Sequence, residues 1–266
     1  MDNFDRGQVS HKAAEVYEDF FVPALFQQWA GRVADAAHIQ KGQYVLDVAC
    51  GTGILARTIA ERLGEASSVV GLDINDGMLA VAAHKAPFID WRHGAAEALP
   101  FDNDSFDVVV SQFGLMFFEN RPLALQEMVR VVRPRGHFAI AVWDSLDHIP
   151  GYFTLVNLLQ RLFGEEVANS LRAPFVLGEP QVLRKLFSEA GIPETTITTV
   201  RGTAHFPSIQ SWVYTNVKGW VLADMLNDHQ FELLLREAEQ ALSPYVTPEG
   251  EVVFEAPAHI ISGVKK

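Results

Sequence analysis

Two acids and a glycine turn in this 266-residue chain have the spacing of a nucleoside-binding site. Asp47 interrupts an apolar run at 44–49, which predicts a buried strand of a parallel sheet. The turn at 51–53 contains two glycines, so its backbone N–H groups can approach a ligand closely. The run 68–73 predicts a second strand, and it ends in Asp73, which is placed to hold ribose hydroxyls.

The charge around the turn distinguishes between two kinds of nucleoside. Gly51, Gly53 and Ala56 also fit G-x-G-x-x-A, the loose form of a dinucleotide-binding fingerprint. A pyrophosphate needs donors and cations, but residues 44–55 contain no Lys or Arg and include Asp47. S-adenosyl-L-methionine carries an ammonium and a sulfonium and no phosphate, so the acids favour this methyl donor.

Four successive motifs carry a resemblance to a known family. They read VLDVACGTG, VVGLDIN, GAAEALPFDNDSFDVVVSQFGLMFF and EMVRVVRPRGHFAIAVW. In order and spacing they resemble the class I S-adenosylmethionine-dependent methyltransferases, and the small-molecule branch similar to the C-methyltransferases of quinone biosynthesis is the nearest type. The resemblance covers about residues 40–145. It implies a methyltransferase that uses S-adenosyl-L-methionine and releases S-adenosyl-L-homocysteine.

The resemblance also implies the residues that bind the cofactor. In the family, the loop that lines the adenine usually has an Asp where this chain has Ala95, which leaves Ala96 and Glu97 as the expected adenine neighbours. Glu97 as a solvated loop charge is the alternative. The tip of the fourth strand is expected beside the methionine portion. The expected cofactor-binding residues are Asp47, Ala49, Gly51, Thr52, Gly53, Asp73, Ile74, Met78, Ala96, Glu97, Ser111, Gln112 and Phe113.

Aromatic and other large apolar residues are the candidates for the acceptor side of the site. By resemblance, part of the N-terminal helical segment forms a lid over cofactor and substrate. The alternative for its aromatic residues is packing on the sheet edge, and Phe117 and Phe118 are interpreted as packing residues. The expected substrate or lid residues are Tyr17, Phe21, Phe26, Met116 and Trp143.

A general base is needed only if the accepting atom loses a proton, and His or Asp can supply one. Asp144 and His148, just past the fifth strand, are the candidate catalytic residues, with His205 behind them. Surface or capping roles are the alternatives for each. Cys50, the single cysteine, is interpreted as a small turn residue because no base is paired with it. The nine histidines show no ligand spacing, so no metal site is expected.

Alternating strand and helix patterns predict an α/β fold with a doubly wound, mainly parallel, seven-stranded sheet of Rossmann-like type. Pro23 is expected to divide the helical segment 11–40 in two, and residues 133–136 are expected to form a turn. Strands are predicted at 44–49, 68–73, 89–92, 106–111, 137–143, 195–200 and 252–264. Helices are predicted at 54–63, 76–86, 119–132, 152–163, 180–190, 208–222 and 229–243.

These elements suggest a single compact unit with three parts. The helical lid covers residues 1–40, the cofactor-binding core 41–145, and the rest of the sheet, with helical substrate-covering insertions, 146–266.

Composition limits the partners. A net charge of −12 argues against a nucleic-acid partner, and no apolar run is long enough for a membrane span. The expected partner is a small-molecule methyl acceptor that is hydrophobic or aromatic, and the expected compartment is the cytoplasm. A homodimer stays open. A nicotinamide-dependent oxidoreductase and a non-catalytic cofactor-binding protein are the alternative functions.

Overall fold

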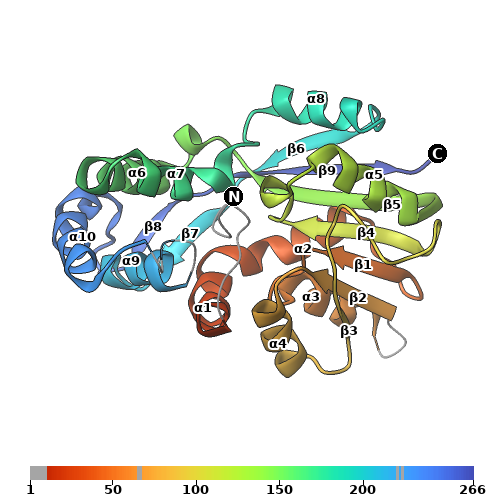
Figure 1. Ribbon diagram of the computed structural model, residues 1–266, viewed down its shortest axis with the longest axis horizontal. Helices are drawn as coiled ribbons and strands as arrows, with labels where there is room; N and C mark the ends of the chain where they lie inside the picture. Colours follow the sequence, from red (N-terminus) through yellow and green to blue (C-terminus); the bar gives the residue numbers. More distant parts are fainter. Residues whose placement is uncertain (1–10, 65–67, 220–221, 223–224) are drawn as a thin grey trace.

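A computed structural model, which describes residues 11–64, 68–219, 222 and 225–266, contains a seven-stranded sheet in the order β3-β2-β1-β4-β5-β9-β6 (Figure 1). Every strand of the sheet is parallel except β9, which pairs antiparallel with both β5 and β6. The predicted seven-stranded, mainly parallel α/β sheet is therefore confirmed. Its strands are β1 (Tyr44–Val48), β2 (Ser68–Asp73), β3 (Asp90–His93), β4 (Phe106–Gln112), β5 (Val132–Trp143), β6 (Thr196–Val200) and β9 (Ala258–Val264).

The strands in the middle of the sheet are buried on both faces, as their apolar sequences require. In β1 and β4, only Tyr44, Asp107 and Gln112 are partly exposed. The helices of the core begin at residues that suit helix ends: the side chain of Asn75 accepts from the Met78 N–H, and that of Asn120 from the Leu123 N–H. These helices are α3 (Ile54–Leu63), α4 (Asp76–Lys85) and α5 (Arg121–Val131).

The helices and short strands within residues 150–172, 203–218 and 228–255 gather beyond the carboxyl ends of the parallel strands, at the left in Figure 1. The position follows from the register of β9, whose first residue Ala258 pairs with Trp143 at the end of β5. An antiparallel pair of strands, β7 (Thr203–Phe206) and β8 (Val252–Glu255), forms a separate two-stranded sheet there. The helices in the same region are α6 (Pro150–Phe163), α7 (Glu165–Arg172), α9 (Ile209–Lys218) and α10 (Asp228–Ala241). Helix α8 (Pro180–Glu189) packs against α5 instead.

The N-terminal segment is one continuous helix, so the predicted break at Pro23 is wrong. A π-helical stretch, η2 (Tyr17–Phe26), joins α1 (His11–Val16) to α2 (Gln27–Ala36). At its end, the N–H of Gln27 donates to the carbonyl of Val22. Proline lacks the N–H and normally clashes with the preceding turn, and we attribute its tolerance here to the wider π-helical turn. The stretch thereby keeps the aromatic residues on either side of Pro23 in one helix.

Other local predictions also need correction. Residues 133–136 do not form a separate turn before β5 but belong to the strand, with a register shift between its first pairs with β4. The single strand predicted at 252–264 is two strands in two different sheets, interrupted after Glu255. The sequence does not predict strand β7, which pairs with β8, or helix α7. The predicted helix at 208–222 ends at Lys218, and its residues 220 and 221 lie outside the described residues, as do residues 1–10 of the predicted lid.

No helix among the described residues is long and apolar enough to cross a membrane.

Candidate active site

A cleft of about 880 Å³ lies at the carboxyl ends of β1, β2 and β4. Chain order reverses between β1 and β4, and open α/β sheets bind ligands at such a point. The cleft gathers most of the residues that the sequence singled out. Those lining it are Tyr17, Phe26, Asp47, Ala49, Gly51, Thr52, Asp73, Ile74, Met78, Ala96, Glu97, Gln112, Phe113 and Trp143.

Asp47 is a buried acid without a hydrogen-bond partner. Asp47 is 1% exposed, and neither carboxylate oxygen makes a hydrogen bond to any residue that the structure describes. Burial raises the pKa of Asp47 well above its usual range, and the nearby Asp73 raises it further. The backbone N–H of Ala56 lowers this pKa in part, although its geometry does not make a hydrogen bond. A cation in the cleft would therefore be stabilised by Asp47, and the carboxylate would become ionised on binding it.

Asp73, unlike Asp47, accepts hydrogen bonds with both carboxylate oxygens, and these bonds organise the turn. Its Oδ2 accepts from the Gly51 N–H at 2.8 Å, and its Oδ1 accepts from the Asn75 N–H at 2.8 Å. Burial raises the pKa of Asp73, and the backbone N–H groups of Asn75, Gly51 and Ile74 partly offset this effect. One side chain at the end of β2 thus holds the glycine turn after β1 in place.

Strained and crowded backbone positions shape the turn. Ala49 has a φ of 57°, in the left-handed region that non-glycine residues rarely adopt. Gly53 does not line the cleft but begins helix α3 with a φ of 87°. A Cβ added at Gly53 would lie 2.4 Å from the ring of Trp91 on β3, and one added at Gly71 on β2 would lie 2.3 Å from the same ring. The indole therefore requires glycine at both positions.

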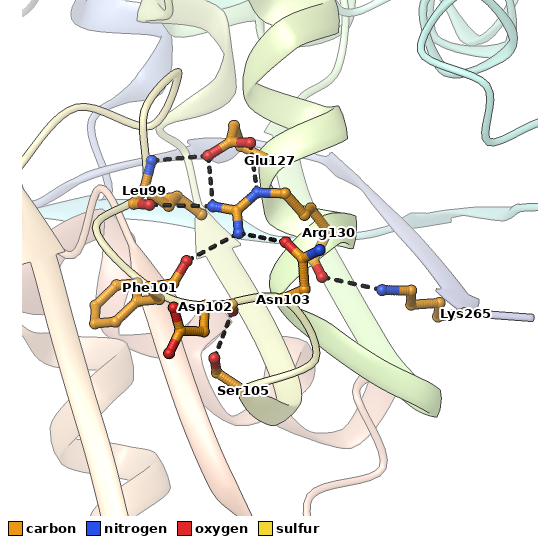
Figure 2. Close-up of polar contacts among 8 residues, drawn as sticks. All are labelled: Leu99, Phe101, Asp102, Asn103, Ser105, Glu127, Arg130 and Lys265. Carbon is orange, nitrogen blue, oxygen red and sulfur yellow. Dashed lines mark hydrogen bonds and ion pairs between the residues drawn. The ribbon is translucent and has the colours of Figure 1, made fainter.

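The loop at 94–101, which supplies Ala96 and Glu97, is held by an ion pair on α5 (Figure 2). Glu127 accepts from the Leu99 N–H at 3.0 Å and pairs with Arg130 at 2.6 Å. Arg130 in turn donates to the carbonyls of Leu99 at 3.1 Å and Phe101 at 2.8 Å. The pairing raises the pKa of Arg130 and lowers that of Glu127. These bonds fix the loop, although neither Glu127 nor Arg130 lines the cleft.

Glu97 is more than the solvated loop charge considered as its alternative. Its Oε1 accepts from the N–H of Glu119 at 2.9 Å and from that of Asn120 at 3.2 Å, directly before α5. A carboxylate at the amino end of a helix is favourably placed. Glu97 therefore joins the 94–101 loop to the segment that follows β4, and it also lines the cleft.

Stacked aromatic residues form one wall of the cleft. The rings of Phe113 and Trp143 stack at 3.8 Å with 8° between their planes, and Phe26 lies 5.6 Å from Phe113 and 5.0 Å from Tyr17. Phe113 has a φ of 58°, which is costly for a bulky residue and is typical of functional positions. Burial raises the pKa of the Tyr17 hydroxyl, so Tyr17 stays neutral.

The remaining residues predicted for the site lie behind its walls. Phe21 packs in the hydrophobic core against Phe206, at 6.3 Å. Ser111 is fully buried and its Oγ has no partner, while Met116 is 3% exposed in the core. None of these three lines the cleft. Cys50 does line it, and burial raises the pKa of its thiol well above the usual range, so the geometry agrees with a turn residue.

The candidate base residues form a separate network that does not line the cleft. The Oδ1 of Asp144 lies 3.0 Å from Nδ1 of His148, 3.1 Å from Nε2 of the buried His259, and 2.7 Å from the Ser145 nitrogen. Its hydrogen bond raises the pKa of His148, whose side chain is 64% exposed. His205 pairs with Glu251 at 3.0 Å on the surface. This geometry gives a proton-transfer role no support.

Sequence reasoning missed Arg121, Leu186 and Glu189, which also line the cleft. Phe117 and Phe118, interpreted as packing residues, do pack against the core but line the cleft as well. Arg121 begins α5, nine residues after the end of β4, and its place in the segment that follows the fourth strand's tip is the one signal that could have found it. Leu186 and Glu189 come from α8, and no sequence feature indicates that α8 reaches the cleft. Among the described residues, no group of three metal-binding side chains occurs.

The chain is similar to known methyltransferases. Residues 46–140 match a family model described as a methyltransferase domain. A demethylmenaquinone methyltransferase from Shouchella clausii is 34% identical over 211 residues, which cover 73% of this chain and 89% of that enzyme. A ubiquinone/menaquinone biosynthesis C-methyltransferase from Pseudoalteromonas translucida is 30% identical over 214 residues, which cover 73% of this chain and 85% of that enzyme.

The fold has matches of lower sequence identity. Phosphoethanolamine N-methyltransferase 2 of Haemonchus contortus, solved with S-adenosylhomocysteine, aligns with a TM-score of 0.64 at 16% identity. The alignment covers 100% of this chain and 60% of that chain. The YcgJ protein of Bacillus subtilis aligns with a TM-score of 0.60 at 18% identity, over 90% of this chain and 98% of that chain.

The chain therefore belongs to the methyltransferase-domain family and is a class I S-adenosylmethionine-dependent methyltransferase. Within that class it is a distant homologue of the C-methyltransferases of quinone biosynthesis. The predicted family, enzyme class and cofactor are confirmed.

Proposed function

We propose that this enzyme transfers the methyl group of S-adenosyl-L-methionine to a small, hydrophobic or aromatic acceptor. The aromatic wall of the cleft supports this proposal, since Tyr17, Phe26, Phe113 and Trp143 offer flat apolar surfaces to a ligand. The relatives named for demethylmenaquinone and for quinone biosynthesis point to the same kind of acceptor.

The single observation that carries the cofactor's placement is the unpartnered carboxylate of Asp47. The ammonium of the methionine portion is the cation that would satisfy it. Asp73, already fixed by two backbone N–H groups, would hold the ribose hydroxyls. Ala96 and Glu97 would lie beside the adenine. Ile74 and Met78 also line the cleft and would contact the nucleoside. Gln112 and Phe113, at the tip of β4, would face the methyl group.

The reaction is an in-line displacement. The acceptor atom forms a bond to the methyl carbon while the bond from that carbon to sulfur breaks, and sulfur keeps the electron pair as a neutral thioether. Positive charge is dispersed in this step, so the main contribution of the protein is to align the acceptor, carbon and sulfur. Asp144 and His148 have no part in this proposal, since they hold the end of β5 outside the cleft.

Each of the three parts of the chain has its own role in this reaction. Residues 41–145 bind the cofactor, and the described part of residues 1–40 contributes Tyr17 and Phe26 as a lid over the cleft. Residues 146–266 complete the sheet, and α8 adds Leu186 and Glu189 to the cleft. We propose that their helices cover the acceptor.

Calorimetric titration with S-adenosylhomocysteine, run beside NADH and repeated on Asp73→Ala, tests the cofactor's placement. We expect binding of the thioether that is lost in the variant, and no response to NADH. A screen with S-adenosylmethionine labelled in its methyl group then compares phenolic and quinol acceptors with small aliphatic amines and sugars. Transfer to the aromatic set supports the acceptor class, and transfer to the polar set alone would refute it.

A further inference from the structure

Arg121 is a half-buried cation whose hydrogen-bonding capacity is largely unused. Its Nη2 donates to the carbonyl of Met116 at 2.7 Å, which is its sole hydrogen bond among the described residues. Its Nε is buried and has no partner. Burial lowers the pKa of Arg121. An ionised group in this environment carries a desolvation cost that a bound anion would recover.

Arg130, near the other end of α5, has a structural role, and its hydrogen bonds can be compared with those of Arg121. Its Nε and Nη2 donate to Glu127, and its Nη atoms also donate to Leu99, Phe101 and Asn103 (Figure 2). These bonds use all the N–H groups that a guanidinium has. Among the described residues Arg121 makes a single bond of this kind, from Nη2, which leaves Nη1 and the second N–H of Nη2 for a ligand, while Nε is buried.

The cleft gives Arg121 a distinct electrostatic position. Among the described residues that line it, Arg121 is the sole Lys or Arg, whereas Asp47, Asp73, Glu97, Glu119 and Glu189 are acids. The two aspartates come from β1 and β2, where the cofactor's cationic and ribose groups are proposed to bind. Arg121 comes from the segment after β4, which also supplies Phe113 and Phe117 to the cleft and packs near α8.

We propose that Arg121 binds an anionic group of the methyl acceptor, a carboxylate or another oxyanion on an aromatic or hydrophobic body. This inference rests on the proposed function, because it assigns Arg121 to the acceptor and not to the cofactor. The guanidinium offers a planar pair of N–H groups that matches such an anion. The aromatic wall receives the ring of the acceptor, and Arg121 selects acceptors by charge.

Matched aromatic probes test this inference in the whole 266-residue chain saturated with S-adenosylhomocysteine. The probes are 2-naphthoate, which carries a carboxylate, and 2-naphthamide, its neutral counterpart, titrated by calorimetry. In the wild type we expect naphthoate to bind about 10- to 100-fold more tightly than naphthamide, as for one hydrogen-bonded charge pair. Arg121→Gln should reduce this preference to about 1-fold, and Arg121→Lys should keep part of it.

Arg161→Gln is the control for net charge, because Arg161 pairs with Glu237 on α6 and α10 and does not line the cleft. It should leave the preference unchanged. No naphthoate binding by the wild type, or a preference for naphthoate in Arg121→Gln as large as that of the wild type, would overturn the inference. A loss of S-adenosylhomocysteine affinity in Arg121→Gln would also overturn it, since Arg121 would then serve the cofactor.

Failure of the proposed function has a different signature. If the wild type does not bind S-adenosylhomocysteine, the cofactor placement is wrong, and the same naphthoate and naphthamide titrations on the unliganded protein still decide whether Arg121 binds an anion. Thermal denaturation of both Arg121 variants establishes that they are folded. Loss of the naphthoate preference in folded Arg121→Gln, with the preference kept in Arg161→Gln, supports the inference.

Discussion

Asp47→Asn should make the ligand-free protein more stable and the cofactor site weaker. Each buried polar atom without a partner costs about 1–3 kcal/mol, and both oxygens of Asp47 lack one. Asparagine keeps the shape and is neutral without taking up a proton on folding, so we expect the free energy of unfolding to rise by about 1–2 kcal/mol at about pH 8. For a chain of this size this corresponds to an increase in Tm of roughly 2–8 °C.

The effect should depend on pH with a definite sign. Because burial raises the pKa of Asp47 in the folded state, the folded protein holds a proton that the unfolded chain has released. Wild-type stability from this group is fully present below the unfolded pKa and is lost as pH rises through the raised folded pKa. Asparagine does not titrate. The stability advantage of Asp47→Asn should therefore grow across that window and level off above it.

Asp73→Asn is the matched control, with the same substitution in the same cleft. Asp73 accepts hydrogen bonds from the Gly51 and Asn75 N–H groups, so an amide there loses one acceptor. We expect this variant to lose about 1–2 kcal/mol of stability. Urea denaturation from about pH 5 to about pH 8 measures both variants, and the pH series locates the window.

Cofactor affinity completes the test of Asp47. Calorimetry with S-adenosylhomocysteine should show a loss of about 10- to 100-fold in Asp47→Asn, the value of one charge-assisted hydrogen bond. In the wild type, binding should release a proton, which buffers of different ionisation enthalpy detect. If Asp47→Asn were as destabilised as Asp73→Asn, or bound the thioether as tightly as the wild type, the reasoning about Asp47 would be refuted.

Three further predictions concern other parts of the fold. Arg130→Met should cost about 2–3 kcal/mol in urea denaturation and weaken S-adenosylhomocysteine binding, since it frees the 94–101 loop; unchanged affinity would contradict the positioning role. Arg135→Gly should raise stability by about 0.5–1 kcal/mol, because Arg135 has a φ of 65°; a loss in the same assay would exclude strain there. Gly71→Ala should cost about 1–3 kcal/mol in the wild type but much less in a Trp91→Leu background, as a double-mutant cycle would measure.

The sequence predicted the cofactor half of the molecule well because its signals are local. An apolar run with one acid, a glycine turn and a helix follow each other directly in the chain, and β2 and α3 have the predicted limits. The topology of a parallel sheet then brings Asp47 and Asp73 to one edge. The geometry of these residues could therefore be anticipated without knowledge of any distant contact.

The rest depends on contacts between residues far apart in sequence. Pro23 has a strong local signal for a helix break, but the packing of Phe21 and Phe26 on both sides of it keeps one helix. The short strand β7 is stabilised by β8, which lies about 50 residues later, so its own four residues could not indicate it. Likewise, the unused N–H groups of Arg121 are a property of its neighbours and not of its position in the chain.

The antiparallel strand β9 has a consequence for how the protein folds. Within the main sheet β6 pairs with β9 and with no other described strand, and β9 follows β5 by more than 100 residues. During synthesis, β5 therefore waits with an open edge until residues 258–264 emerge, and β6 joins the sheet only through them. Such long-range closure slows folding and leaves the exposed edge open to pairing with other chains. The nascent enzyme would depend most on chaperones in that interval.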